Sequence, residues 1–271
     1  VDLLAVEILQ LNPWRCVPIF KMRYCFKWCC THHCEKPNRT KHHQAQCRIT
    51  HQAPGAGLKV DQEIIQDIPG LFGALKRTEE HFIGTFQEQE IAEKLMGHEQ
   101  VLCIVNTRQQ AMDIFSDLPE SDENIHLSAL MYPVHRTAKL ASVRTRLQDG
   151  LPCRVVSTQL IEAGVDVDFP AVYRAVAGID SIAQAAGRCN RNGLSVTPCM
   201  VSVFAFPEDG GCAFFRQAAQ SAEKLFDQFA GKLTEPECVR AYFADFFWKN
   251  EQRMDSDGII AEYCLPACRG D

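Results

Sequence analysis

The strongest chemical signal in the sequence is one glutamine and two arginines spaced along residues 184–191. The run Gln184-Ala-Ala-Gly-Arg188-Cys-Asn-Arg191 is expected to lie on a helix. At 100° per residue, Gln184, Arg188 and Arg191 then fall within an arc of about 60°. Two guanidinium groups beside an amide suit a polyphosphate, because arginine presents a planar fork of donors that is always charged. The alternative is a solvated helix face whose arginines interact favourably with the helix C-terminus.

A second cluster of polar residues directly follows an apolar run that predicts a buried strand. It extends over residues 157–168, with the sequence STQLIEAGVDVD. In an open parallel sheet, ligands bind at the carboxyl ends of the strands. Here Thr158 offers a hydroxyl, Gly164 permits an unusual turn, and Asp166 can accept a hydrogen bond from a ribose or orient an arginine. An ordinary loop with Asx turns would explain either cluster alone, but it explains both clusters on one sheet poorly.

Two weaker signals stand at other strand-to-helix junctions. Asn106, Thr107 and Arg108 follow the first buried strand at the start of a helix, which is a natural place for a phosphate. His135 and Arg136 precede a basic helix at a second junction of this kind. For both groups the alternative is helix capping and ordinary surface charge.

The elements that would position these residues alternate between strands and helices. Apolar runs predict strands at 101–105, 125–130, 154–158, 172–177 and 200–206, after a strand-like segment at 79–86. Amphipathic stretches predict helices at 87–97, 108–118, 137–148 and 181–190, the last capped by Asp180. This alternation predicts an α/β domain whose parallel sheet is covered by helices on both faces. Two aromatic-rich helices, 214–228 and 235–249, are expected to follow.

Composition divides the chain into two unlike pieces. The 271 residues are 46% hydrophobic and 23% charged, as in globular proteins, with a net charge of −6. No run of 18 apolar residues predicts a membrane span and no signal peptide is expected, so we expect a protein that does not enter the membrane. Residues 1–57 carry eight basic and three acidic side chains, a net charge of +5, and contain six of the 14 cysteines and five of the nine histidines. The remaining residues carry a net charge of −11.

Three interpretations compete for residues 1–57. A zinc ion could be held by Cys25, Cys29 or Cys30, His33, Cys34 and Cys47, but only the Cys25-x₃-Cys29 spacing resembles half of a zinc site, so no metal ligand is assigned. A basic arm that contacts nucleic acid is the second interpretation. We favour the third, a poorly organised extension that the α/β domain does not need for folding. The later cysteines are scattered singly, which indicates a reducing, cytoplasmic location.

The two polar clusters at residues 157–168 and 184–191 resemble the motifs of a known family. The pattern T-x₃-E-x-G-x-D from Thr158 to Asp166, followed by Q-x₂-G-R-x₂-R from Gln184 to Arg191, resembles motifs five and six of superfamily 2 helicases. Residues 101–108, 156–168 and 179–193 are similar to the CRISPR-associated helicase–nucleases of type I interference systems, within a likeness that runs from about residue 68 to about residue 264. The resemblance implies the second RecA-like lobe of an ATP-dependent, single-stranded-DNA helicase of antiviral defence.

The same resemblance implies roles for individual residues. Arg188 and Arg191 would be arginine fingers on ATP, and Gln184, Gly164 and Asp166 would line the nucleotide cleft. The residues that would contact single-stranded DNA are Asn106, Thr107, Arg108, Thr158, His135 and Arg136. Two alternatives stay open: a lobe of another superfamily 2 translocase acting on RNA or DNA, and a non-catalytic Cys/His module that binds nucleic acid.

Several helicase and nuclease signatures are missing from the sequence. There is no G-x₄-G-K-[ST] phosphate loop, the only Asp-Glu pair (Asp122-Glu123) lies in a predicted loop, and no histidine is followed by aspartate. We therefore expect a first lobe, which holds Mg²⁺, and a nuclease domain to lie outside this chain, with a CRISPR surveillance complex as a further partner. The chain alone is expected not to hydrolyse ATP. The expected divisions are 1–57, the lobe at 58–210, and the helical start of a C-terminal accessory region at 211–271.

Overall fold

The computed structural model describes residues 67–162, 164–207 and 213–253. The Cys/His-rich segment 1–57, with its candidate zinc ligands, lies outside these ranges. The chain divides into two compact units, one of them Pro69–Trp248 and the other residues 1–68 with 249–271. Nearly all of the described residues belong to the first unit, and the account below concerns that unit.

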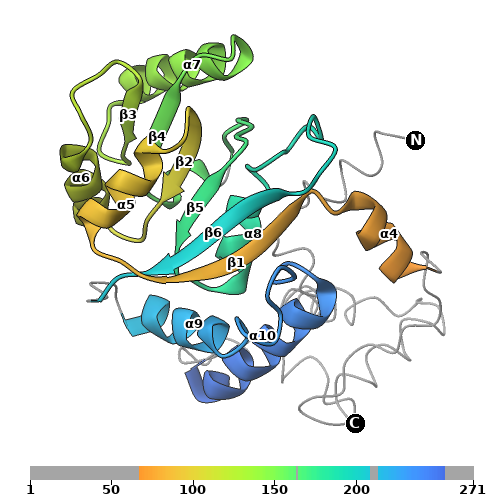
Figure 1. Ribbon diagram of the computed structural model, residues 1–271. Helices are drawn as coiled ribbons and strands as arrows, with labels where there is room; N and C mark the ends of the chain where they lie inside the picture. Colours follow the sequence, from red (N-terminus) through yellow and green to blue (C-terminus); the bar gives the residue numbers. More distant parts are fainter. Residues whose placement is uncertain (1–66, 163, 208–212, 254–271) are drawn as a thin grey trace, which may run out of the picture. The chain divides into compact units, whose positions relative to one another are not determined.

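Six parallel strands form one sheet at the centre of the unit (Figure 1). The strands are β1 (Thr78–Thr85), β2 (Gln100–Ile104), β3 (Asn124–Leu127), β4 (Cys153–Ser157), β5 (Val172–Ala175) and β6 (Cys199–Ala205). Their order across the sheet is β1-β6-β5-β2-β4-β3, and every pairing is parallel. The parallel sheet predicted from the sequence is therefore confirmed.

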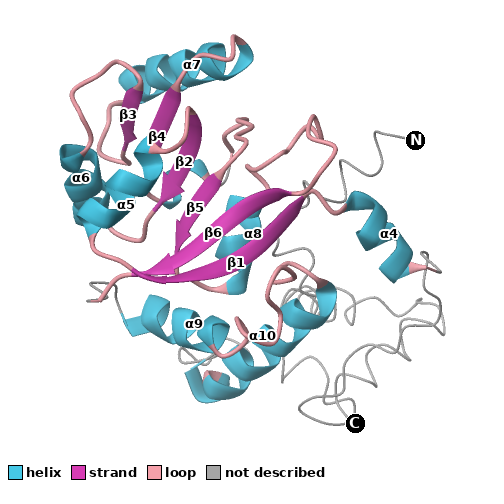
Figure 2. Ribbon diagram, viewed as in Figure 1, coloured by secondary structure: helices cyan, strands magenta, loops and turns pink. Residues whose placement is uncertain are grey.

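Helices connect the strands, and two more follow the sheet in the sequence (Figure 2). They are α4 (Ile68–Leu75), α5 (Glu88–Met96), α6 (Arg108–Asp117), α7 (Pro133–Gln148), α8 (Ile179–Ala186), α9 (Ala213–Glu223) and α10 (Pro236–Lys249). Two short 3₁₀ turns, η2 (Gln159–Ile161) and η3 (Glu251–Arg253), complete the described elements. The chain is thus helical after the last strand, as the sequence predicts.

The two faces of the sheet carry separate cores because successive side chains of a strand point to opposite sides. On one face Val101 and Cys103 of β2 pack with Ile91 and Leu95 of α5 and with α6. On the other face alternate residues of β2 pack against α7, α8 and residues 161–169. A third cluster joins Val203 of β6 and α8 to α9 and α10. Helices therefore cover both faces, as expected.

Several predicted boundaries are wrong at the places where function is in question. Helix α8 begins after Gly178, so Asp180 lies in its first turn and is not its cap, and it ends at Ala186 and not at residue 190. Helix α7 begins at Pro133, because a proline is well accommodated in a first helical turn, and not at residue 137. Strand β3 ends at Leu127, and residues 128–131 form a turn in place of the predicted strand.

The strand order places a change of direction between β2 and β5. The chain leaves β2 through α6 on one face of the sheet and leaves β5 through α8 on the other face. Neighbouring strands whose connections depart in opposite directions form a topological switch point, the usual ligand position in sheets of this kind. The segments that begin at Asn106 and Val176 stand on either side of this point.

Candidate functional site

The sequence clusters meet at the carboxyl edge of the three central strands. Ile104 of β2 pairs with Ser157 of β4 on one side and with Arg174 of β5 on the other. The three segments that leave these strands therefore start side by side, although they are far apart in the sequence. They are residues 105–108, residues 158–168 and residues 176–191.

A buried arginine that the sequence clusters did not include ties these segments together. The Arg174 side chain is fully buried at the end of β5, and its Nε lies 2.9 Å from Oε1 of Glu162. Its Nη1 donates to Oδ1 of Asn106 and to the carbonyl of Ala175, both at 2.8 Å, and its Nη2 donates to Oγ of Ser181 at 2.8 Å. One guanidinium thus bonds the segment after β2, the segment after β4 and the first turn of α8.

Glu162 is the negative partner in this network. Its carboxylate is 6% exposed and accepts from Oγ of Ser181, with both oxygens at 2.9 Å. Burial raises the pKa of Glu162 above its usual value, against the attraction of Arg174 and the Ser181 hydrogen bond. A buried carboxylate is tolerated only when an ion pair and hydrogen bonds replace its lost solvation. The pair of Glu162 and Arg174 therefore braces the site by holding its segments together.

The first group of predicted nucleic-acid contacts separates into internal and exposed residues. The amide of Asn106 accepts from Arg174 and donates to the carbonyl of Val176 at 2.8 Å, so it joins the segments that leave β2 and β5. Thr107 caps α6 in a reciprocal pair with Gln110, each hydrogen bond being 3.1 Å long. Only Arg108 of the three is exposed. Capping, the alternative considered for this group, thus accounts for Thr107.

The expected common face of Gln184, Arg188 and Arg191 is wrong, because α8 ends before either arginine. Arg188 is instead buried, and its guanidinium donates to the carbonyls of Ile161 at 3.0 Å and Glu162 at 2.6 Å. These two bonds fasten the end of η2 to the segment that follows α8. Gln184 remains on α8 and is half-buried.

Arg191 lies in a tight turn and is held by two aspartates. Its Nε is 2.9 Å from Oδ1 of Asp166, and the Arg191 side chain is 24% exposed. Asp168 accepts from the backbone N–H groups of Arg191 at 2.7 Å and Asn192 at 2.9 Å. Asn190 adopts the left-handed conformation, with φ of 47°, where the chain turns. The turn therefore presents one partly exposed guanidinium whose direction Asp166 fixes.

The remaining predicted site residues differ in accessibility. Gly164 has φ of 74°, the left-handed conformation that glycine adopts without strain. Thr158 is buried, and the turn η2 begins directly after it. His135 is exposed and Arg136 half-buried, and both lie inside the first turn of α7 rather than at a loop junction.

Burial explains two cysteines of the sheet. Cys103 and Cys153 are fully buried, as their apolar surroundings in the sequence predict. Burial raises the pKa of Cys103 to about 12 and that of Cys153 to about 11, so both thiols stay protonated and pack as small apolar groups.

Neither a metal-ligand cluster nor a membrane-spanning helix is found among the described residues. Within residues 67–162, 164–207 and 213–253, no three His, Cys, Asp or Glu side chains gather as metal ligands would. Over the same ranges, no helix combines the length and the apolar character that crossing a bilayer requires.

Comparison with known proteins places these motifs in a family context. Residues 97–194, which include β2 to α8 and the turn at Arg191, match the family model of the C-terminal part of the CRISPR-associated nuclease/helicase Cas3. This segment is similar to the C-terminal helicase lobe of Cas3. The Cas3 of Methanothermobacter thermautotrophicus is 31% identical over 111 residues, which cover 39% of this chain and 13% of that protein. The chain thus spans a small part of the length of the Cas3 protein that it matches.

Solved structures support the same fold. A crystal structure of T. fusca Cas3 with ATP superposes with a TM-score of 0.55 at 16% identity, over 71% of this chain and 27% of that one. A chain of a CRISPR RNA-guided surveillance complex, pre-nicking, superposes with a TM-score of 0.54 at 15% identity, over 70% of this chain and 29% of that one. The unit therefore has the fold of the RecA-like lobe of Cas3.

Proposed function

We propose that this chain is the second RecA-like lobe of an ATP-dependent helicase of the Cas3 type, which moves along single-stranded DNA in CRISPR antiviral defence. The observation that carries the proposal is the convergence of three segments at the carboxyl edge of β4, β2 and β5, all within the residues that match the family model. ATP, single-stranded DNA, a first helicase lobe, a nuclease domain and a CRISPR surveillance complex are the partners that this proposal requires.

Arg191 is the arginine finger of the proposed site. It is partly exposed, it stands in a turn fixed by Asp168, and Asp166 orients its guanidinium. An arginine in such a position stabilises the negative charge that develops on a phosphoryl group during transfer. Arg188, by contrast, is committed to the carbonyls of Ile161 and Glu162, so we assign it the task of holding the turn in place.

The other residues around Arg191 fit a nucleotide in chemical type. Gln184 and Asp166 offer hydrogen-bonding groups, and Gly164 keeps the loop free of a side chain. ATP supplies the phosphoryl group when it is bound between two lobes. We assign Mg²⁺ to the first lobe, because the sequence of this chain has no phosphate loop and its only Asp-Glu pair, Asp122-Glu123, lies in a loop.

The test is the replacement of Arg191 by alanine in the complete protein, with the first lobe present. Loss of an arginine finger lowers turnover by about 10³–10⁵-fold, so ATP hydrolysis stimulated by single-stranded DNA should become barely measurable. The fold should remain intact, because the ion-pair partner of Arg191 is Asp166, whose side chain is 80% exposed, and pairs with so exposed a member contribute little stability.

Arg216→Ala is the matched control, since Arg216 is an exposed arginine on α9. It should leave turnover and the melting temperature unchanged. Arg188→Ala should differ from both, because it leaves two carbonyls without their donors and lowers the melting temperature as well as the rate. Near-normal ATP hydrolysis in Arg191→Ala would assign this arginine to the solvent and refute the proposed role.

A further inference from the structure

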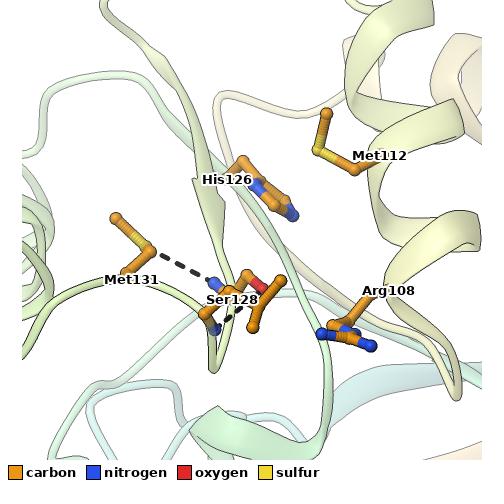
Figure 3. A pocket seen from close by; sticks show the side chains of 6 residues that line it. Arg108, Met112, His126, Ser128 and Met131 are labelled. Atoms are coloured by element: carbon orange, nitrogen blue, oxygen red, sulfur yellow. Dashed lines mark hydrogen bonds between the residues drawn. The ribbon is translucent and has the colours of Figure 1, made fainter.

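A cavity lies beside the predicted DNA-contacting residues, between the first turns of α6 and the end of β3. It has a volume of about 280 Å³ and is lined by Arg108, Met112, His126, Ser128, Leu130 and Met131. Figure 3 shows these side chains around a common space, with Arg108 and Met112 on α6 facing His126 and Ser128. The cavity opens at the carboxyl edge of the sheet, where ligands of parallel sheets bind.

The lining is apolar with a few polar groups, which is the usual chemistry of a ligand site. Met112, Leu130 and Met131 provide the apolar walls, and thioether side chains adapt their shape to flat aromatic groups. His126 packs on Phe115 at a ring distance of 5.6 Å, on the face of β3 that meets α6. Its Nε2 is shielded from solvent and has no hydrogen-bond partner among the described residues. Burial lowers the pKa of His126, so a neutral imidazole forms part of this wall.

The turn that forms one wall is held in place by its own hydrogen bonds. The Met131 N–H donates to the Ser128 carbonyl at 3.1 Å, and the Leu130 N–H donates to Oγ of Ser128 at 3.3 Å. The turn directs Leu130 outward, so its side chain is 74% exposed although it is large and apolar. Tyr132, at the start of α7, is 79% exposed. Leu130 therefore presents exposed apolar surface beside the cavity that it lines.

The positively charged side chains near the cavity favour a negatively charged ligand. Arg108 contributes a cation to the cavity itself. Helix α7 begins directly after the turn, and its charged residues are all basic, namely Arg136, Lys139, Arg144 and Arg146. A ligand that combines negative charge with a flat apolar group therefore matches both features. Single-stranded nucleic acid has this combination, with phosphates for the basic side chains and bases for the cavity.

We propose that this cavity receives one base of the bound single strand, with the neighbouring phosphate on Arg108. The proposal rests on the proposed function, and it adds to it a base subsite that is separate from the backbone contacts. The base lies against Met112 and Leu130. Because stacking and apolar contact accept any base, we expect no strong sequence preference.

The experiment compares two strands of equal length that differ only in their bases. The full chain is titrated against a fluorescent oligothymidylate and against an abasic strand, and binding is followed by anisotropy. Replacing Met112 and Leu130 together by alanine should weaken binding to oligothymidylate by about 5- to 100-fold, the range for loss of one stacked base. The same double variant should bind the abasic strand like the parent chain. Both side chains are substantially exposed, so the variant should also melt like the parent.

Two controls separate the base subsite from the rest of the surface. Val134→Ala removes an apolar side chain that is 83% exposed and lies outside the cavity, so it should change binding to neither strand. Arg108→Ala should weaken binding to both strands alike, because it removes a phosphate contact.

The outcomes distinguish failure of the base subsite from failure of the proposed DNA binding. Equal weakening of both strands by the Met112/Leu130 variant, or no weakening of either, would overturn the base subsite and leave the proposed DNA contact standing. Failure of the parent chain to bind either strand would instead refute the DNA contact, and the base subsite with it. A photo-crosslink from 5-iodouracil to the peptide that contains residues 128–132 would support the subsite directly.

Discussion

The buried pair of Arg174 and Glu162 gives the most demanding prediction. Replacement of Arg174 by methionine keeps an unbranched side chain of similar length but removes the charge and every donor. Glu162, 6% exposed, is then left as a buried carboxylate with Ser181 as its remaining side-chain partner. Breaking a buried ion pair by removal of one member costs about 3–5 kcal/mol. Solvent screening does not reduce this figure, since Arg174 is fully buried.

The expected loss is large relative to the stability of a domain. Globular domains are stable by about 5–15 kcal/mol, so Arg174→Met should remain folded but lose a large share of that free energy. For a unit of this size, the melting temperature should fall by about 6–20 °C. The assay is urea unfolding of the full chain, followed by circular dichroism, with thermal melts as a second measurement.

A double-mutant cycle isolates the ion pair from lost packing. Glu162→Gln introduced into Arg174→Met removes the stranded charge, so the double variant should be more stable than the two single effects added together, by about 1–3 kcal/mol. Additive effects, or a loss below about 1 kcal/mol in Arg174→Met, would show that the pair does not brace the site and would refute the reasoning.

The dependence on pH provides a second check of the same pair. Burial raises the pKa of Glu162 already in the presence of Arg174, and removal of Arg174 takes away an interaction that lowers it. A carboxyl group whose pKa is raised on folding contributes stability below its unfolded pKa, and this contribution is lost as pH rises through the folded pKa. The stability lost in Arg174→Met should therefore be smallest near pH 4.5 and should grow as the pH rises.

Two further predictions concern a second buried carboxylate and the chain as a whole. Burial raises the pKa of Glu80, whose oxygens accept from the hydroxyls of Thr78 at 2.6 Å and Thr234 at 3.3 Å. Glu80→Gln keeps the shape of the side chain and one acceptor oxygen, and its NH2 group can donate to the other threonine hydroxyl. Because the variant carries no charge, its stability relative to the parent should increase as pH rises above about 4.5. A flat difference across denaturant titrations at several pH values would contradict this. The chain alone, assayed by phosphate release with single-stranded DNA, should not turn over ATP, and a rate on the order of 1 s⁻¹ or more would contradict a site shared between two lobes.

The sequence predicted the type and order of the elements well, because their signals are local. Strands β2, β4, β5 and β6 are mainly apolar runs of four to seven residues, and a parallel sheet follows from the alternation with helices. The end of α8 was missed although Gly187 signals it, since glycine at the end of an apolar period commonly terminates a helix. The predicted arc of Gln184, Arg188 and Arg191 depended on a helix that continues through that glycine.

The Arg174 network could not be predicted, because it depends on which strands are neighbours. Arg174 stands alone in the apolar run of β5, and Glu162 follows β4 in a loop. Their pairing requires β2 to lie between β4 and β5 so that all three ends meet at one edge. Periodicity gives no information on strand order. A single charged residue inside an apolar strand is nevertheless a usable signal, because such a residue must find a partner when it is buried.

The distribution of hydrogen bonds at this edge determines how its variants should be interpreted. The side chains of Asn106 and Arg188 donate to backbone carbonyls of neighbouring segments. Their replacement therefore changes the internal structure of the site. Arg108 and Arg191 keep exposed guanidinium surface and can meet a ligand without breaking an internal bond of comparable cost. A fall in activity on replacing Asn106 is therefore no evidence of a DNA contact unless the melting temperature is unchanged. The same fall on replacing Arg108 or Arg191, at an unchanged melting temperature, reports the ligand itself, because the melting temperature then shows that the interior of the lobe is intact.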